Sequence, residues 1–371
     1  MEYRTIEEWC EILDSQRIPI TAKNRIEGPY PYYGANGIQD YVDDYIFDDE
    51  LVLLAEDGGN FGSKDRPIAY RVSGKCWVNN HAHVLKPKND LDVDYLCYSL
   101  MFYNTNGLVN GATRQKLTQS TMRKMKIPYL EINKQREIVQ KIKKIESVLN
   151  DSNRQLDLLD ELIKARFVEM FGDPEDNPFE WDKMPLSNIM LNANNGMARR
   201  GNDENGNIVL RLVELQDGYI DYSNPNRICL NENEKKRYLL KNNDFLFARV
   251  NGNPDNVGRC AVFHDIGEDV YHNDHIIRVH FNEELLNGVF ASELINSNFG
   301  KRQLKKRIKT SAGQYTVSQD GIGAIVSIVP PLELQNQFAS FVEEVDKSRL
   351  RELLAIKQIK LLLNDSWLLF Y

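Results

Sequence analysis

Histidine and cysteine side chains are the first candidates for chemistry in this 371-residue chain, because both residue types ligate metal ions. The tightest histidine pairs are His81-x-His83 and His272-x-x-His275, and Cys260 and His264 lie close to the second pair. A zinc site needs four ligands at a recognisable spacing, and neither pair belongs to such a set. We therefore expect no metal site, and we expect these histidines to form hydrogen bonds in the core or at strand ends.

Fragments of three catalytic motifs occur, but each lacks the surrounding residues that its chemistry needs. Residues 58–64 are rich in glycine, yet they lack the Gly-x4-Gly-Lys-Ser/Thr spacing of a P-loop. Residues 176–179 and 253–255 hold one proline each, whereas an N6-adenine methyltransferase loop holds two and needs a glycine-rich cofactor turn after a strand. Glu234-Lys235-Lys236 has no upstream Pro-Asp partner of the kind found in nucleases. We therefore expect no catalytic site in this chain.

The formal net charge of −8 conceals two basic runs. Residues 111–146 hold ten lysines and arginines against three acids, and residues 301–309 hold six without an acid. Such runs bind phosphate groups even on an acidic chain, because binding depends on the local charge. The alternative is that each run is a solvated helix face.

The bulk composition is that of an ordinary globular protein, with 42% hydrophobic and 27% charged residues. No window approaches the ~20 apolar residues that cross a bilayer, and the first ten residues are too acidic for a signal peptide. The five cysteines occur singly, which indicates buried thiols in a reducing cytoplasm.

An internal repeat relates residues 112–135 to residues 312–335 without a gap. Both copies end in prolines followed by an acid and a glutamine, and proline marks the point where an extended segment gives way to a helix. The aligned pairs include Leu117 with Val317, Gln119 with Gln319, Met122 with Ile322 and Gln135 with Gln335.

Each copy of the repeat is followed by apolar residues at alternating steps of four and three, which is the spacing of a heptad seam. Each predicted helix has roughly 35 residues and a length of about 55 Å, so we expect the two stripes to pack on each other. The first seam consists of Ile138, Ile142, Ile145, Leu149, Leu156, Leu159 and Ile163, and the second of Val342, Val345, Ile356, Ile359 and Leu363.

The globular halves before the helices match more loosely. Residues 49–58 resemble residues 243–252, and both read as a buried strand followed by a turn that contains glycine. His83-Val84-Leu85-Lys86 likewise resembles His275-Ile276-Ile277-Arg278. Short strands with few long helical stripes indicate an α+β class, in which the scaffold repeats and the loops do not. The expected segments are a globular domain at 1–132, a helix at 133–171, a second domain at 172–334 and a second helix at 335–371.

Four segments of this chain resemble the specificity subunits of type I restriction–modification systems. They are Pro330–Phe338, Arg166–Pro174, the aromatic stretch Pro29–Gly37 and Phe179-Glu180-Trp181. The resemblance covers essentially the whole chain, and the order of domain, helix, domain, helix is its most specific part. It implies two target-recognition domains in tandem, held in opposite orientations by long helices that pair as an antiparallel coiled coil.

The resemblance also implies a function. The chain would be a non-catalytic, sequence-specific DNA-binding subunit of a prokaryotic cytoplasmic complex, recognising a bipartite double-stranded target. Two modification subunits would methylate adenine at N6 with S-adenosylmethionine, and restriction subunits would use ATP and Mg for translocation and cleavage. This chain itself would hold no cofactor.

If the resemblance holds, lysines and arginines contact phosphates and loop side chains read base edges. The phosphate-binding candidates are Arg114, Lys116, Lys301, Arg302, Lys305, Lys306, Arg307 and Lys309. The base-reading candidates are Asn36, Asn60 and Asn79 in the first domain, and Arg199, Arg200, Arg249 and Asn251 in the second. Tyr32 and Tyr33 either stack where a target adenine is flipped out or belong to the core.

Three alternatives stay open on the sequence. The chain is a specificity subunit of a bipartite system that is not type I, or a helical scaffold that assembles proteins without DNA, or a free-standing enzyme. A scaffold would bind DNA without a steep salt dependence, and the incomplete motifs argue against an enzyme.

Overall fold

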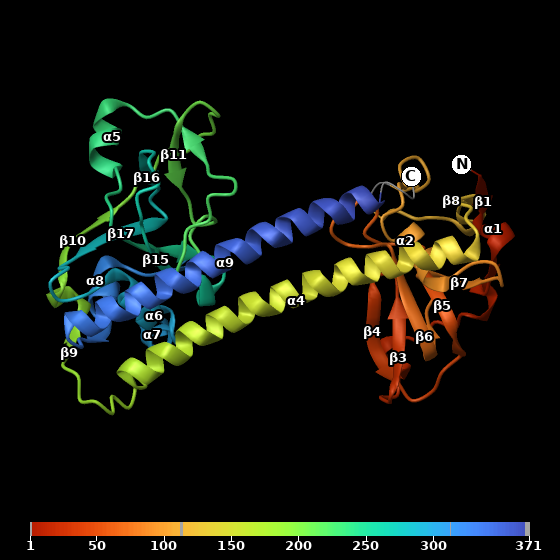
Figure 1. Cartoon of the computed structure of the whole chain (residues 1–371), viewed down its shortest axis with the longest axis horizontal. Coiled ribbons are helices and arrows are strands. Elements are labelled where there is room, and N and C mark those ends of the chain that lie inside the picture. The colour runs from red at the N-terminus through yellow and green to blue at the C-terminus, as the bar shows by residue number, and fades with distance from the viewer. Residues whose placement is uncertain (1, 112–113, 312, 368–371) are drawn as a thin grey trace. The chain divides into compact units, whose positions relative to one another are not determined.

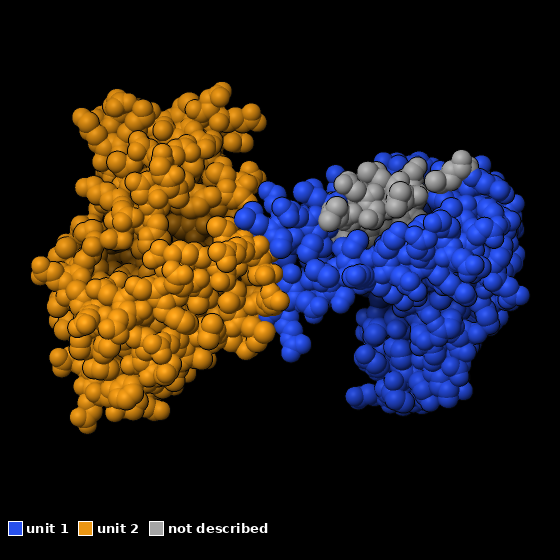
Figure 2. Space-filling model, viewed as in Figure 1, with its two compact units in different colours: residues 1–154, 353–371 blue, residues 155–352 orange. Residues whose placement is uncertain are grey.

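The computed structural model describes residues 2–111, 114–311 and 313–367, and the side chains of these residues except 311 and 362–367. Contacts divide the chain into two compact units (Figure 2). Unit 1 holds residues 1–154 and 353–371, and unit 2 holds residues 155–352. The dividing points lie inside both long helices, so each helix contributes one part to each unit, and the boundaries expected from the sequence stay predictions.

The first domain is built on a six-stranded sheet of order β2-β7-β5-β6-β3-β4 (Figure 1). Its central strand β5 carries five consecutive buried residues, which is the pattern of a strand covered on both faces. β3 pairs parallel with β6, whereas the other neighbours pair antiparallel. The strands are β2 (Cys10–Ile12), β3 (Tyr30–Gly34), β4 (Gly37–Val42), β5 (Phe47–Ala55), β6 (Ala69–Val78) and β7 (Ala82–Pro87).

Short helices and a two-stranded ribbon complete the first domain. α2 packs on β5 and β6 and buries Tyr95, Leu96 and Leu100 in the larger core cluster of this domain. The ribbon joins β1 to β8, directly before the first long helix. These elements are β1 (Tyr3–Thr5), α1 (Ile6–Trp9), α2 (Val93–Met101), α3 (Gln119–Arg123), β8 (Lys126–Pro128) and α4 (Ile132–Phe171).

The second domain repeats this strand order with one central strand divided. β10-β17-β13-β15 form one sheet and β12-β11-β16 form another, and β11 pairs parallel with β16 as β3 pairs with β6. β15 and β16 together therefore occupy the place of β6, with residues 263–269 between them. The strands are β10 (Met190–Asn195), β11 (Asn207–Leu210), β12 (Arg227–Ile228), β13 (Phe245–Ala248), β15 (Cys260–Val262), β16 (Val270–His272) and β17 (Ile276–Phe281).

The remaining elements of unit 2 include a second ribbon, β9 with β20, directly before the second long helix. A small sheet of order β14-β19-β18 follows, and in the first domain isolated antiparallel bridges join Lys116 to Asp57 and to Asn110. The bounds are β9 (Lys183–Pro185), α5 (Glu232–Tyr238), β14 (Val250–Asn251), α6 (Gly288–Asn296), α7 (Asn298–Lys305), β18 (Lys309–Ser311), β19 (Gln314–Thr316), α8 (Gln319–Gly323), β20 (Val326–Ile328) and α9 (Leu332–Trp367).

The aligned glutamines of the repeat explain why it is strict at the start of each long helix. Gln135 is fully buried in the first turn of α4, and its carbonyl oxygen accepts from the backbone N–H of Asp92 at 2.8 Å. Its amide donates to the carbonyls of Asp90 and Leu130 at 2.9 and 2.8 Å. Gln335 makes the same set of bonds. Each glutamine thereby joins its long helix to the N-cap of the short helix that covers the sheet.

The expected long helices are confirmed, and in unit 2 they pack against each other in antiparallel directions (Figure 1). Asp160 forms an ion pair with Arg349, and the ring centroids of Phe167 and Phe338 lie 5.5 Å apart. Because a later residue of α4 meets an earlier residue of α9, the two segments run in opposite directions.

The apolar stripe does more than pair helices. Ile138 and Ile142 pack into the core of the first domain, and Leu159, Ile163, Val342 and Val345 into that of the second. These positions of the stripes therefore also anchor the globular domains, and the predicted seam stays a prediction. Ile356 is buried, Ile145, Leu149, Leu156 and Ile359 are half-buried, and the side chain of Leu363 lies outside the described residues.

Two expectations about burial and membranes have clear outcomes. Cys10, Cys76, Cys97 and Cys260 are buried, but Cys229 is exposed and donates its thiol hydrogen to Asp203 at 2.8 Å, so not every thiol is buried. Within the described ranges, no helix is long and apolar enough to cross a membrane.

Candidate functional site

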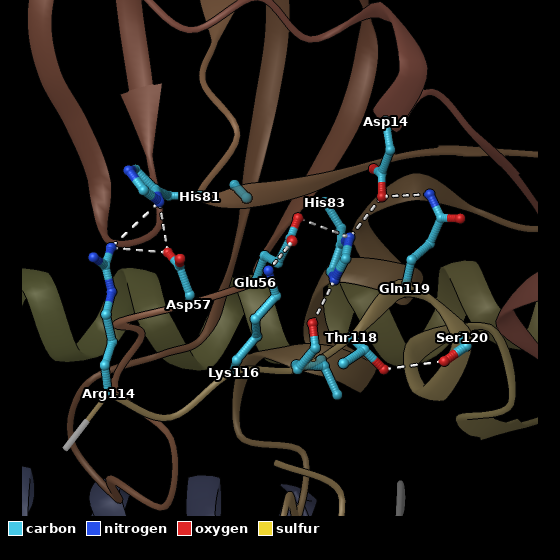
Figure 3. Close-up of polar contacts among 12 residues, drawn as sticks. Asp14, Glu56, Asp57, His81, His83, Arg114, Lys116, Thr118, Gln119 and Ser120 are labelled. Carbon is cyan, nitrogen blue, oxygen red and sulfur yellow. Dashed lines mark hydrogen bonds and ion pairs between the residues drawn. The ribbon is translucent and has the colours of Figure 1, made fainter. Parts of the chain in front are cut away.

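Polar side chains of the first domain gather at the turn between β6 and β7 (Figure 3). Asn79 is 3% exposed, and its side-chain oxygen accepts from the backbone N–H of His81 at 2.8 Å. The carbonyl of His81 in turn accepts from the backbone N–H of Glu56, directly after β5, at 2.9 Å. The turn therefore fixes the half-buried His81 ring at the end of the central strands.

Asp57 joins this histidine to an arginine from a distant loop. One oxygen of Asp57 lies 2.6 Å from Nδ1 of His81 and 3.0 Å from a guanidinium nitrogen of Arg114 (Figure 3). The Arg114 side chain is 58% exposed, whereas that of Asp57 is 18% exposed. The guanidinium is therefore the solvent-facing member of this group, placed to meet an anion.

A second, buried layer lies beside it. Nδ1 of His83 lies 2.7 Å from the Asp14 carboxylate, and Nε2 lies 2.9 Å from the carbonyl of Leu117 (Figure 3). Both ring nitrogens of His83 therefore have a hydrogen-bond partner. Burial raises the pKa of Asp14, but the hydrogen bonds from His83, Gln119 and the backbone of Val84 outweigh burial and hold this pKa below its usual value.

Asp14, Glu56 and His83 are close enough together to be considered as metal ligands. Glu56 is occupied by Arg17 at 2.7 Å and Lys116 at 3.0 Å, and burial, which raises its pKa, is outweighed by these two bonds, which lower it. Because both nitrogens of His83 already make hydrogen bonds, neither has a free lone pair for a metal ion. The cluster is therefore best explained as a buried ion-pair network, and the expectation of no metal stays a prediction.

The second domain repeats the turn between β16 and β17. Asn273 is 4% exposed, and its side-chain oxygen accepts from the backbone N–H of His275 at 3.1 Å. The carbonyl of His275 accepts from the backbone N–H of Arg249 at 2.7 Å. His275 is thus the counterpart of His81, and the alignment of His275 with His83 is wrong by two residues.

An arginine again reaches the histidine of this turn. A guanidinium nitrogen of Arg200 lies 2.7 Å from the Asp274 carboxylate and 3.1 Å from Nε2 of His275. Burial is the largest cause that lowers the pKa of His275, which favours a neutral ring whose Nε2 accepts from the guanidinium. Arg249 donates to the carbonyl of Asp274 at 3.1 Å, so two of the predicted base-reading arginines lie together at one strand end.

Known proteins match this chain in sequence. Residues 1–159 match the family model of the type I restriction modification DNA specificity domain. The StySPI specificity subunit of Salmonella potsdam is 23% identical over 312 residues, which cover 80% of this chain and 67% of that protein. The EcoKI specificity subunit of Escherichia coli K12 is 20% identical over 314 residues, covering 80% and 68%. Residues 1–159 therefore match a type I DNA specificity domain, and the chain as a whole is similar to type I specificity subunits.

One further relative and two solved structures refine this assignment. A Haemophilus influenzae protein assigned as a type I specificity subunit is 37% identical over 139 residues, which span 38% of this chain and 36% of that protein. The type I S subunit of M. genitalium has a TM-score of 0.59 at 14% identity and covers 99% of this chain and 94% of that one. A chain from a study of type I complex assembly has a TM-score of 0.56 at 13% identity, covering 99% and 96%. These two structures support the fold along the whole chain.

The base-reading residues predicted from the sequence differ in their availability. Asn79 is buried with both side-chain polar groups occupied, by His81 and Gln39, so in this structure it holds the turn and does not face a base. Asn36 is exposed but donates to the carbonyl of Gly58, and Asn60 is half-buried. In the second domain Arg199 pairs with Glu234 at 2.8 Å, and Asn251 accepts from the backbone N–H of Asn253.

The predicted phosphate-binding residues are mostly paired with acids. Lys301 pairs with Asp217, Lys305 with Asp255 and Arg302 with Glu175 at 2.8, 3.0 and 2.5 Å. These pairs are solvent-exposed and contribute little to stability, so a phosphate can replace the carboxylate at small cost. Arg307 donates to the carbonyls of Gln303 and Ala324, and Lys306 and Lys309 are exposed.

The aromatic residues near β3 have structural roles. Tyr32 is 1% exposed, and its hydroxyl makes hydrogen bonds with the backbone of Ile20, so the core alternative holds for this residue. Tyr33 is half-buried and stacks on Tyr70. The residues that sequence reasoning missed are Asp57 and Asp274 beside the two turn histidines; the repeated tripeptide Asn-Asn/Asp-His was the available signal.

Proposed function

We propose that this chain is the DNA-binding subunit that gives a type I restriction–modification complex its target sequence. Each domain reads one half of a bipartite double-stranded site, and the chain directs adenine N6 methylation and restriction by its partner subunits. One observation carries the proposal: the scaffold and its turns 79–81 and 273–275 are repeated in both domains, whereas the loops that reach these turns differ.

The repeated parts and the divergent parts are separated cleanly. The strand order, the ribbon before each long helix and the buried glutamines are the same in both domains. By contrast, Arg114 reaches its turn from the loop before α3, whereas Arg200 reaches the other turn from the loop after β10. Two copies of one scaffold with different loops suit two readers of different short sequences, because base readout depends on the side chains that loops present.

The proposal assigns the chemistry to partners. Two modification subunits supply S-adenosylmethionine-dependent methylation, and restriction subunits supply translocation and cleavage with ATP and Mg. In this assignment the long helices act as a docking platform and as a spacer between the two readers, so that an unread gap separates the half-sites. A 40-residue helix has a length of about 60 Å.

Mapping of N6-methyladenine across the genome tests the proposal. The gene for this chain is deleted and then restored in the host, and methylation is mapped in all three strains. We expect a bipartite motif that disappears on deletion and returns with the gene. Co-purification with the neighbouring gene products should recover a methyltransferase subunit. Unchanged methylation together with DNA binding that lacks a steep salt dependence would instead favour a protein scaffold.

A further inference from the structure

The two recognition domains hold one three-residue turn in the same place with the same hydrogen bonds. In each turn, 79–81 and 273–275, the first asparagine is buried and caps the N–H of the histidine two residues later. The backbone N–H of that asparagine donates to the carbonyl of Tyr33 in β3 or of Leu210 in β11, at 3.0 Å in both cases. The turn is therefore tied to three strands of its sheet, and both histidine rings have rigid positions.

Each turn histidine is met by one arginine that is paired with one aspartate and faces solvent. Arg114 lies 3.3 Å from Nδ1 of His81, and Arg200 lies 3.1 Å from Nε2 of His275. The arginine side chains are 58% and 52% exposed, whereas the side chains of their partners Asp57 and Asp274 are 18% and 27% exposed. Both guanidinium groups therefore cover a more buried carboxylate and present their outer edge to solvent.

We propose that Arg114 with His81, and Arg200 with His275, form equivalent phosphate anchors, one in each recognition domain. The anchors grip the DNA backbone without regard to sequence and set where each domain sits on its half-site. The inference rests on the proposed function, and it moves Arg200 from base reading to phosphate binding. The histidines are positioning residues: His275 accepts from the guanidinium of Arg200, whereas His81 holds Asp57, which pairs with Arg114.

A backbone contact explains the repetition better than a base contact. Half-sites of a bipartite target differ in their bases, so base-reading groups should differ between the domains, as the loops do. Phosphates are common to every half-site, so an arginine that reaches the same scaffold turn in both domains, even from a different loop, suits them. The aspartates fit the same role, because each holds a guanidinium extended and ready while DNA is absent, and an exposed pair of this kind exchanges its carboxylate at small cost.

The test uses the full chain purified with its methyltransferase partners and two DNA duplexes. One duplex carries the motif found by methylation mapping, and the other has both half-sites scrambled. Binding is followed by fluorescence anisotropy between about 50 and 200 mM salt. The variants are Arg114→Gln and Arg200→Gln, alone and together. Arg4→Gln and Arg227→Gln are the matched controls, because these arginines lie outside both basic runs and pair with Asp90 and Glu268.

We expect each turn variant to weaken binding to both duplexes by the same factor. The slope of log affinity against log salt should become shallower by about 0.9 for each arginine, which is the value for one lost phosphate contact. The methylated motif should stay the same, and the controls should leave the slope unchanged. A changed motif with unchanged binding to the scrambled duplex would assign these arginines to base reading and overturn the inference.

Asp57→Asn and Asp274→Asn separate a DNA contact from a structural role. Without the competing carboxylate charge, each guanidinium is freer to meet a phosphate, so we expect tighter binding to both duplexes. If these variants weaken binding as the arginine variants do, the group only supports the fold and the inference fails. If the wild-type complex prefers neither duplex, the proposed function fails instead.

Discussion

The buried side chains of Gln135 and Gln335 are stable in the interior because their hydrogen-bonding groups have partners. Gln135 and Gln335 are each 0% exposed and each satisfy one backbone N–H and two carbonyls. Buried amides of this kind are costly to leave unpaired, so a change to the side chain removes more than the bonds themselves. The same reasoning applies to His83 and Asp14 under the first-domain turn.

Gln135→Leu should loosen the junction between α4 and α2. The change leaves the N–H of Asp92 and the carbonyls of Asp90 and Leu130 without their partner, at a cost of about 3 kcal/mol. Hydrogen–deuterium exchange should show faster exchange at the start of α2. Gln140→Leu, at an exposed position of the same helix, is the control and should leave α2 unchanged. Equal protection of α2 in both variants would remove the role given to Gln135.

His272 makes the stability of the second domain depend on pH. Burial lowers its pKa from 6.5 to about 4, and Nε2 is buried without a hydrogen-bond partner among the described residues. As pH falls from 6.5 towards 4, the unfolded chain binds a proton that the folded chain does not, so the free energy of unfolding falls by up to about 3 kcal/mol.

Urea unfolding of His272→Gln measures this effect. Part of the loss of stability between about pH 7 and pH 4.5 should disappear in the variant, because the proton-binding difference is gone. His264→Gln, at an exposed position, is the control and should keep the wild-type dependence. A pH dependence that is identical in wild type and His272→Gln would contradict the assignment.

At the scale of elements, aromatic packing joins α4, α6 and α9 in unit 2. Phe338 is fully buried, and its ring lies 5.5 Å from that of Phe167 and 5.7 Å from that of Phe171. Both α4 phenylalanines also contact Phe290 of α6. Each long helix is therefore fixed to the second domain by a core contact rather than by the heptad seam alone.

Phe338→Ala should destabilise unit 2 by about 4 kcal/mol, because it opens a cavity beside the rings of Phe167 and Phe171. Leu350→Ala, at a 59% exposed position of the same helix, should change the free energy of unfolding by less than about 0.5 kcal/mol. Both values are measured by urea unfolding of the full chain. A small effect of Phe338→Ala would show that α9 does not depend on this cluster.

The sequence predicts elements whose apolar pattern repeats over many residues, and it fails for elements that are too short to show such a pattern. The helices were predictable because their apolar residues recur over five turns or more, and Gln135 and Gln335 were found because no insertion separates them from the prolines. β15 and β16, with three residues each, are too short to show alternation, so the divided strand was not foreseen. The turn histidines were misaligned because the spacing between the copies is 194 residues there and 200 at the glutamines, so loop insertions shift the register.

The candidate site was predictable in part for the same reason. Arg114 and Arg200 were selected by residue type, but their partners Asp57 and Asp274 come from different points of the two sequences. Their contacts depend on tertiary structure, because no local pattern records which loop reaches a strand end. Asn79 was selected as a base reader although its side chain is used inside the turn.

At the scale of the whole molecule, the chain has a net charge of −8 and consists of two units. The two units share one scaffold, and each has its own cluster of polar side chains at the strand ends. Most basic candidate contacts lie beside acids, so affinity for DNA should depend on many small exchanges of carboxylate for phosphate. We therefore expect a steep loss of DNA affinity with salt for the assembled complex. The central claim is that each domain reads its own half of the target.

Exchange of one domain tests that claim most directly. Residues 172–331 are replaced by the corresponding segment of a type I specificity subunit, α4 and α9 are kept, and N6-methyladenine is mapped in cells that carry the chimera. The account predicts that one half of the methylated motif changes to that of the donor while the other half stays as it was. A motif that changes in both halves, or in neither while methylation continues, would contradict the account.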